Sequence, residues 1–98
     1  MTALIIEENS NLLSFIKVLL TQSGIEVFTS RNAQDGLEVL RKNKHINHIV
    51  SDSKFADMDS VEFMLKAASI QGKDSVTIVS PRQFFDFLGS ALYEPGRF

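Results

Sequence analysis

The stretch Ile49-Val50-Ser51-Asp52 is the part of this sequence that indicates the fold most directly. Its first residues have the composition of a buried strand, and Asp52 ends the run and begins a loop that continues to Ser60. An earlier apolar run, Ala3 to Ile6, ends in the acidic pair Glu7-Glu8. If the two runs are neighbouring parallel strands, three carboxylates follow their ends at one edge of the sheet. The sequence therefore predicts a candidate site for a divalent cation and a phosphoryl group at this edge.

Strand-like and helix-like segments alternate along the first 80 residues. Apolar residues at helical spacing predict three helices, with start signals near Asn9, Asn32 and Asp59 and glycine stop signals at Gly24 and Gly72. This alternation predicts a doubly wound α/β domain with a parallel sheet covered on both faces. Ligands bind beyond the carboxyl ends of the strands in such sheets. The expected strands are four short runs: residues 3–6, 25–29, 48–51 and 76–79.

The last segment, residues 81–98, follows no regular pattern. Residues 82–88 are long enough for a turn or two of helix, and residues 91–93 are expected to form a short fifth strand. No sequence remains for a closing helix, so one sheet face is expected to be only partly covered. An exposed aromatic patch would then mark a contact surface, such as a homodimer interface through residues 81–98. Its expected members are Phe84, Phe85, Phe87, Tyr93 and Phe98.

Composition excludes several classes of function. The formal net charge is -2 at pH 7 with both signs scattered, so no basic patch for nucleic acid is expected. No apolar run approaches the roughly 20 residues that cross a membrane, and no secretory signal begins the chain, so a cytoplasmic location is expected. The chain has no cysteine, and no Ser-His-Asp or Cys-His constellation is visible, so the sequence does not indicate an enzyme.

The order of strands, helices and acidic residues in this sequence resembles that of the receiver domain of bacterial response regulators. The resemblance is strongest over residues 3–80 and leaves residues 81–98 as an atypical tail of a single domain, residues 1–98. It implies a flavodoxin-like sheet with strand order 2-1-3-4-5 that lacks the last helix. Four matches carry it, in order along the chain: the acidic pair Glu7-Glu8, the strand-ending Asp52, the loop end Met58-Asp59-Ser60, and Ser80 after the fourth strand.

The resemblance implies a signal transduction module of a two-component system. Asp52 would accept a phosphoryl group from a sensor histidine kinase or another signalling protein, and the Ser80 hydroxyl would respond to it. Four groups would hold Mg²⁺: the side chains of Glu7, Glu8 and Asp52 and the backbone carbonyl of Lys54. Because the family usually carries an aspartate where this chain has only the longer glutamates, and Mg²⁺ demands near-ideal octahedral geometry, we expect its binding to be weak.

Departures from the family pattern keep other interpretations open. The family's lysine after the fifth strand is missing, and Glu94-Pro95 stands in its place or merely begins a tail. Asp52 could instead be a helix-capping or loop acid, and Ser80 could belong to an ordinary Ser-Pro turn. The glutamate pair, Glu7-Glu8, could be two solvated loop acids.

Besides a phosphorylated receiver, two other classes of function are considered. The chain could be a degenerate pseudo-receiver that is not phosphorylated and acts by dimerisation or partner binding. An enzyme or a flavin-binding protein on the same fold is the third class, but the loop after the first strand is acidic where phosphate binding favours glycines and hydroxyls.

Overall fold

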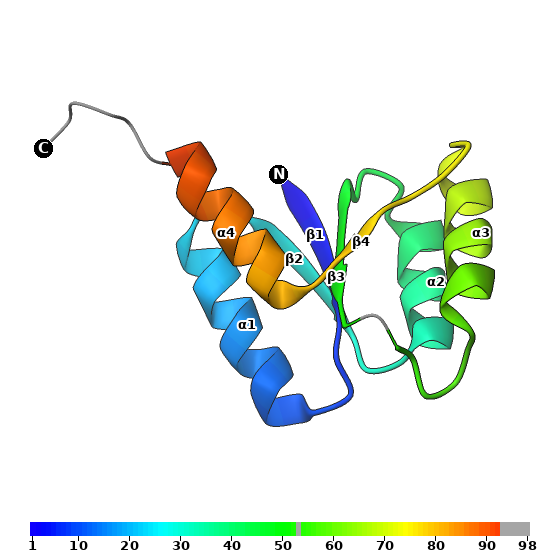
Figure 1. The fold of residues 1–98 in the computed structure, drawn as a ribbon, viewed down its shortest axis with the longest axis horizontal. Helices are drawn as coiled ribbons and strands as arrows, with labels where there is room; N and C mark the ends of the chain where they lie inside the picture. Colours follow the sequence, from blue (N-terminus) through cyan, green and yellow to red (C-terminus); the bar gives the residue numbers. More distant parts are fainter. Residues whose placement is uncertain (53, 93–98) are drawn as a thin grey trace, which may run out of the picture.

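A parallel four-stranded sheet lies between two layers of helices (Figure 1). The computed structural model describes residues 1–52 and 54–92, the last three of these by their backbone alone. None of the described helices is long and apolar enough to span a membrane. The strands are β1 Thr2–Ile6, β2 Glu26–Ser30, β3 His48–Ser51 and β4 Ile78–Val79, and the helices are α1 Ser10–Gln22, α2 Ala33–Lys42, α3 Ser60–Gln71 and α4 Pro81–Leu92.

Capping residues start the first three helices where the sequence predicts. The Asn9 side chain accepts a hydrogen bond from Leu12 N at α1, and Asn32 accepts one from Asp35 N at α2. The Asp59 carboxylate accepts two backbone hydrogen bonds at α3. Each cap satisfies amides that have no partner inside the helix. Gly72 ends α3 at a φ of 66°, a left-handed conformation that glycine adopts without steric cost.

The strand register brings three chain segments level at one edge of the sheet. Ile6, the last residue of β1, pairs with Ser30 at the end of β2 and with Ser51 at the end of β3. Because all three strands run parallel, the residues that follow them emerge side by side. The backbone amide of Glu7 confirms this, since it donates to the Ser30 carbonyl at 3.0 Å. The predicted meeting of the loops after the first and third strands is therefore correct.

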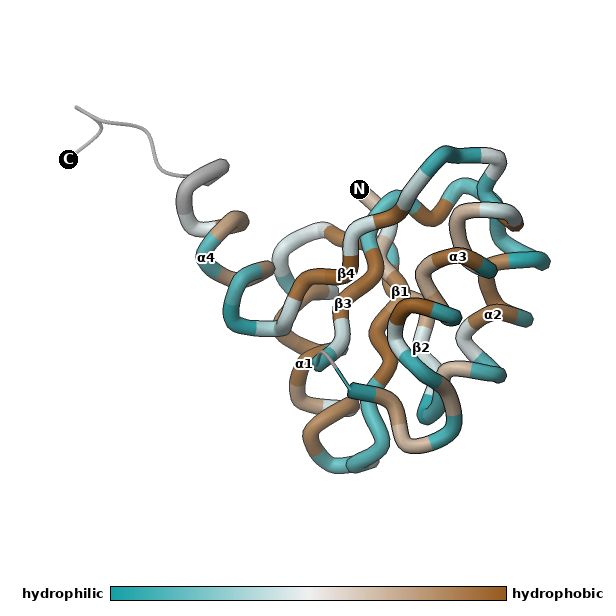
Figure 2. The backbone as a smooth tube through the Cα atoms, turned by 45° about the vertical axis from the view of Figure 1, so that its right-hand side comes forward, coloured by the Kyte–Doolittle hydropathy of each residue, from teal (hydrophilic) through white to brown (hydrophobic). Residues whose placement is uncertain are grey.

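Two hydrophobic clusters, one on each face of the sheet, hold the helices in place. Figure 2 shows hydrophobic residues concentrated along β1 and β3, as expected for strands buried on both faces. Leu4 and Ile6 point into the cluster under α2 and α3, while Ala3 and Ile5 point into the cluster under α1 and α4. A Cβ added at Gly36 of α2 would lie 2.7 Å from the Ile6 Cδ1 atom, so glycine allows α2 to pack closely on β1.

The segment after β4 forms a longer helix than the sequence suggests. Residues 81–92 form the 12-residue helix α4, which lies beside α1 (Figure 1), so the expectation of only a turn or two of helix was wrong. The expected fifth strand at residues 91–93 was wrong for residues 91 and 92, which belong to this helix, while residue 93 lies outside the described residues. Phe84 is 2% exposed, so the expected exposed patch was also wrong for this residue. Its other expected members differ: Phe85 is half-buried, Phe87 is exposed, and Tyr93 and Phe98 lie outside the described residues.

A local capping motif explains why α4 is a full helix. The Ser80 hydroxyl accepts a hydrogen bond from Gln83 N, and the Gln83 side chain accepts one in return from Ser80 N. This reciprocal arrangement is a capping box, and Pro81 suits the first helical position because its missing N–H would have no helical partner there. The Ser-Pro sequence, which reads as a turn, is therefore a helix start.

The position of α4 leaves β4 as the edge strand of the sheet within the described residues. A right-handed connection from β4 to a further strand beyond it would place its helix on the same face as α3. α4 lies instead on the α1 face, where Phe84 and Leu88 pack against Ile5 and Val50. Within the described residues, the expected strand order 2-1-3-4-5 is therefore shortened to 2-1-3-4, and the helix after β4 closes the face that was expected to stay partly bare.

His48 belongs to the packing beneath α4. Its ring centroid lies 5.3 Å from that of Phe84 and 6.0 Å from that of Phe87. Burial lowers the pKa of His48 from its ordinary value of 6.5, and the positive charges of the N-terminus and Lys73 lower it further. His48 is therefore a half-buried residue beside this core, and it favours the neutral form.

Candidate functional site

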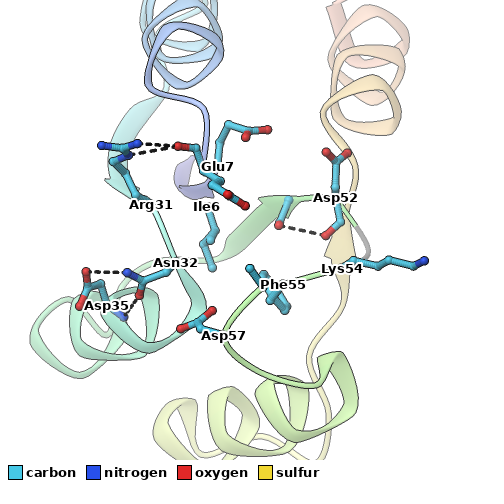
Figure 3. Close-up of a pocket in the computed structure, with 12 residues that line it drawn as sticks. Ile6, Glu7, Arg31, Asn32, Asp35, Asp52, Lys54, Phe55 and Asp57 are labelled. Carbon is cyan, nitrogen blue, oxygen red and sulfur yellow. Dashed lines mark hydrogen bonds between the residues drawn. The ribbon is translucent and has the colours of Figure 1, made fainter.

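A cavity of about 570 Å³ lies at the carboxyl edge of the sheet (Figure 3). Residues that follow β1, β2 and β3 line it, as the level register of these strands requires. Among them are all the residues expected to hold a metal ion: Glu7, Glu8, Asp52 and Lys54. The structure thus gathers these residues around one cavity, whereas Ser80 lies outside it.

Asp52 is the first residue after β3, and its side chain is exposed to solvent. Its backbone carbonyl accepts a hydrogen bond from the Ser51 hydroxyl at 3.0 Å. No described residue donates a hydrogen bond to the Asp52 carboxylate, and Asp59 is the cap of α3. The Asp52 side chain therefore has no capping role among the described residues and is free to approach a ligand from solvent.

The acidic pair has local partners that limit its freedom. A Glu7 carboxylate oxygen accepts a hydrogen bond from Asn9 N at 2.8 Å. Glu8 is exposed, and its backbone carbonyl accepts two hydrogen bonds from the Arg31 guanidinium, at 3.1 and 2.8 Å. Glu7 therefore helps to shape the turn into α1, while the side chain of Glu8 stays in solvent.

The oxygen ligands have the right chemistry for Mg²⁺, but they do not converge. Within residues 1–52 and 54–92, no three acidic or histidine side chains lie close enough together to hold a metal ion. A bound ion would require the side chains of Glu7, Glu8 and Asp52 to move toward one another, and the Glu7 oxygen that does not accept from Asn9 N is the one left for a metal contact. Such a rearrangement costs free energy, so weak Mg²⁺ binding remains our expectation.

Arg31 supplies a positive charge at this cavity that the sequence pattern does not single out. It follows Ser30, the last residue of β2, and its guanidinium holds the loop after β1 through the Glu8 carbonyl. The side chain of Lys54, the other cation at the cavity, extends away from Glu7 and Arg31 (Figure 3). Arg31 is the second residue after the strand expected at 25–29, so inspecting two residues beyond every expected strand, and not only the acidic ones, would have found it.

Asp57 is a second residue that the sequence pattern does not single out. Its two carboxylate oxygens accept hydrogen bonds from Ala33 N and Gln34 N, each at 3.0 Å. Desolvation raises the pKa of Asp57, but together the hydrogen bonds from Gln34 and Ala33 outweigh it, so the pKa lies below its ordinary value of 3.8. The loop that follows Asp52 is thereby fastened to the N-terminus of α2, where the helix dipole also favours a negative charge.

We expect Asp57→Asn to lower the free energy of unfolding by about 1 kcal/mol at neutral pH, because an amide offers one accepting oxygen to two backbone amides. A carboxylate with a lowered pKa in the folded state stabilises the fold above its unfolded pKa, and this stabilisation is lost as the pH falls through the folded value. The difference between variant and wild type should therefore shrink below pH 3.8. Urea unfolding at several pH values measures this difference in the free energy of unfolding.

Asp35→Asn is the matched control for the Asp57 variant. It removes a charge from the same end of α2, but the Asp35 carboxylate accepts only from the Asn32 side chain among the described residues. Its effect on the free energy of unfolding should be smaller, a few tenths of a kcal/mol. Equal effects of the two variants would contradict a specific role of the Asp57 hydrogen bonds.

Ser80 lies on the other side of Asp52. Both residues line a second cavity, of about 580 Å³, between α1 and the start of α4. The Ser80 hydroxyl is engaged in the cap of α4 through Gln83 N. The structure therefore brings Ser80 next to the cavity that Asp52 shares, but not into contact with the acidic pair.

The fold and these two cavities define a doubly wound α/β domain with an acidic site at the carboxyl edge of its parallel strands. No protein-family model and no curated protein matches this chain. Solved structures do match it, and the receiver fold of response regulators is the one they share with this chain.

Three of these structures describe the similarity. A response regulator receiver domain protein from Clostridium thermocellum is 26% identical with a TM-score of 0.70, over 81% of this chain and 64% of that one. The receiver domain of the hybrid histidine kinase CckA is 18% identical with a TM-score of 0.75, over 95% of this chain and all of that one. A CheY-like receiver domain protein from Methanospirillum hungatei JF-1 is 21% identical with a TM-score of 0.68, over 93% and 92% of the two chains. This chain thus spans less than two thirds of the length of the Clostridium protein.

Proposed function

We propose that this chain is a receiver-like module of a two-component signalling system and that Asp52 accepts a phosphoryl group. The level ends of β1 and β3 support the proposal most directly, because they place Asp52 and the acidic pair around one cavity open to solvent. A carboxylate at the end of a parallel strand, exposed and without a described hydrogen-bond partner, suits a nucleophile.

In the proposed reaction, an Asp52 carboxylate oxygen attacks the phosphorus of a phosphohistidine or of a small acyl phosphate. The bond from phosphorus to its previous carrier breaks, and the carrier leaves with the electron pair. The side chains of Glu7, Glu8 and Asp52 and the Lys54 carbonyl would hold Mg²⁺, which would supply positive charge to offset the charge of the transferred group. Arg31 holds the loop that carries Glu7 and Glu8, and so positions these side chains.

The phosphoryl donor would approach Asp52 from the second cavity. The apolar side chains of Leu12 and Phe15 on α1 line it together with Pro81 and Phe85 of α4. Phe15 is 61% exposed, which is unusual for a side chain of this size in a small domain. This groove offers a sensor histidine kinase or another signalling protein an apolar contact directly beside the proposed phosphoacceptor.

A pseudo-receiver that is not phosphorylated is the second candidate function. Two observations favour it: the acidic side chains of the described residues form no ready metal cluster, and the Ser80 hydroxyl is already used in the cap of α4. The lysine of the family is also missing from this sequence. Such a module would act through protein contacts alone, including dimerisation.

Nuclear magnetic resonance with a phosphoryl mimic separates these two functions. Beryllofluoride and Mg²⁺ added to the ¹⁵N-labelled protein should shift the amide signals of Asp52, Lys54 and Ser80 if Asp52 is a phosphoacceptor. Mg²⁺ alone is the control and should move only signals near its four proposed ligands, Glu7, Glu8, Asp52 and Lys54, and leave the Ser80 signal in place. A spectrum that saturating beryllofluoride leaves the same as with Mg²⁺ alone would rule out the phosphoacceptor and leave the pseudo-receiver.

A further inference from the structure

Arg82 is a positively charged residue of α4 that lies beside Asp52. Val50 pairs with Val79 in the parallel strands β3 and β4, so Asp52 and Pro81, two residues further along each chain, follow side by side. Neighbouring strands lie about 4.8 Å apart, and Arg82 is the next residue of α4. Arg82 and Asp52 also line the same cavity, the one between α1 and the start of α4. An arginine side chain at this position can therefore reach a group attached to Asp52.

The placement of α4 on the α1 face turns one side of this helix toward the cavity. Arg82, Phe85 and Asp86 line the cavity and lie three or four positions apart, so they share that side of α4. The Asp52 side chain extends toward the first turn of α4, the orange helix in Figure 3. A cation of α4 and the proposed phosphoacceptor thus border the same space.

The stability of α4 does not account for an arginine at this position. Arg82 is exposed and forms no ion pair with a described residue, although Asp86 lies one turn away. As the second residue of α4, Arg82 lies at the positive end of the helix dipole, where a cation is unfavourable. The first turn of α4 has no acidic residue that would offset this charge. Residues that break such a local rule occur preferentially at functional sites.

We propose that Arg82 binds the phosphoryl group at Asp52, an inference that rests on the proposed phosphoacceptor. The guanidinium donates hydrogen bonds to the phosphoryl oxygens as the group passes to Asp52, and it forms no covalent bond and takes up no proton. A phosphoryl group brings about -1.5 to -2 charges and three acceptor oxygens, which extend beyond the carboxylate into the cavity. Arginine presents a planar set of donors that matches such oxygens.

Two other cations at the acidic edge are less suited to this contact. Arg31 follows β2, so β1 separates it from Asp52 by two strand spacings, about 10 Å. The Arg31 guanidinium is also engaged by the Glu8 carbonyl. The side chain of Lys54 points in a different direction from that of Asp52 (Figure 3). Arg82 combines a place beside Asp52 with a guanidinium that has no described ion-pair partner.

Labelling of the Arg82→Gln protein tests this contact in the full chain. With acetyl phosphate and Mg²⁺, its rate of phosphoryl incorporation should fall about tenfold or more below that of the wild type, because donors to the transferred oxygens are lost. Arg82→Lys keeps the charge without the planar set of donors, so it should recover part of the rate. The time course of the mass increase in intact-protein mass spectrometry measures these rates.

Lys17→Gln is the matched control for the loss of one positive charge. Lys17 is exposed on α1 and does not line the cavity, so its replacement should leave the labelling rate at the wild-type value. An Arg82→Gln protein that is labelled as fast as the wild type would overturn the proposal. A Lys17→Gln protein that is slowed as much as Arg82→Gln would overturn it too, because the effect would then come from net charge alone.

Stability distinguishes phosphoryl binding from a structural role of Arg82. Arg82→Gln removes a cation from the positive end of a helix dipole, so its urea midpoint should equal the wild-type value or lie slightly above it. A clearly lower midpoint would mean that Arg82 supports the fold, contrary to the proposal. In the ¹⁵N spectrum, the Arg82 Nε–H signal should shift when beryllofluoride is added to the protein with Mg²⁺. A signal that beryllofluoride leaves in place would contradict the contact.

The failure of this inference and the failure of the phosphoacceptor are distinguishable. If Asp52 is labelled and Arg82→Gln is labelled equally fast, only the role of Arg82 is wrong. If the wild-type protein takes no label and the Asp52 amide does not respond to beryllofluoride, both proposals are wrong.

Discussion

Asp52→Asn should abolish the incorporation of a phosphoryl group from acetyl phosphate in the presence of Mg²⁺. The amide lacks the anionic oxygen that attacks phosphorus, so the loss should be complete and not graded. Intact-protein mass spectrometry under acidic quench measures the incorporation, because an acyl phosphate survives best at low pH. This is the largest functional effect that the proposed site predicts.

Asp59→Asn is the control for the Asp52 variant. Asp59 caps α3 in the same loop, where its carboxylate accepts hydrogen bonds from Val61 N and Glu62 N at 3.1 and 3.2 Å. Its replacement should cost stability of about 1 kcal/mol or less but leave the labelling in place. If labelling persists in Asp52→Asn and disappears in another acidic variant, that other residue is the phosphoacceptor and the assignment of Asp52 is wrong.

Phe84→Ala should produce the largest loss of stability, about 3 to 5 kcal/mol. The side chain is 2% exposed and packs with Ile5, Val50 and Leu88 between α4 and the sheet. A loss of this size is a large part of the 5 to 15 kcal/mol that is typical for whole domains. Urea unfolding followed by circular dichroism measures it.

Phe87→Ala is the matched control, because Phe87 lies on the same helix but is 48% exposed. It should cost clearly less, about 1 kcal/mol. The pKa of His48 gives a second readout, since burial lowers it and the Phe84 ring lies 5.3 Å away. Phe84→Ala should raise this pKa toward 6.5 in the folded protein. Equal losses of stability in the two variants, together with an unchanged pKa of His48, would mean that α4 does not cover the α1 face of the sheet.

Local signals in the sequence were sufficient for the first part of the fold. Asn9, Asn32 and Asp59 cap helices where polar residues precede apolar periodicity, and Gly24 and Gly72 adopt positive φ where those helices end. These features depend on neighbours along the chain, so a sequence shows them directly. The Ser80 capping box is equally local, but the aromatic residues that follow it also fit an exposed surface patch.

The candidate site was predictable only in part. Glu7 and Asp52 could be placed together because parallel strands align their carboxyl ends. The hydrogen bonds of Asp57 with Ala33 and Gln34 join residues more than 20 positions apart, and no periodicity in the sequence predicts such a contact. Side-chain directions, such as that of Lys54 away from Glu7 and Arg31, depend on rotamers that the sequence pattern leaves undetermined.

Sequence patterns were enough to predict the alternation of strands and helices, the parallel sheet and the edge at which the acidic residues gather, because periodicity, caps and right-handed connections are local or nearly general rules. Which face of the sheet α4 covers follows from the three-dimensional packing. A helix with apolar residues can pack on either face, and the choice depends on which core has room for Phe84 and Leu88. That choice closes the α1 face and leaves the outer edge of β4 without a partner strand within the described residues.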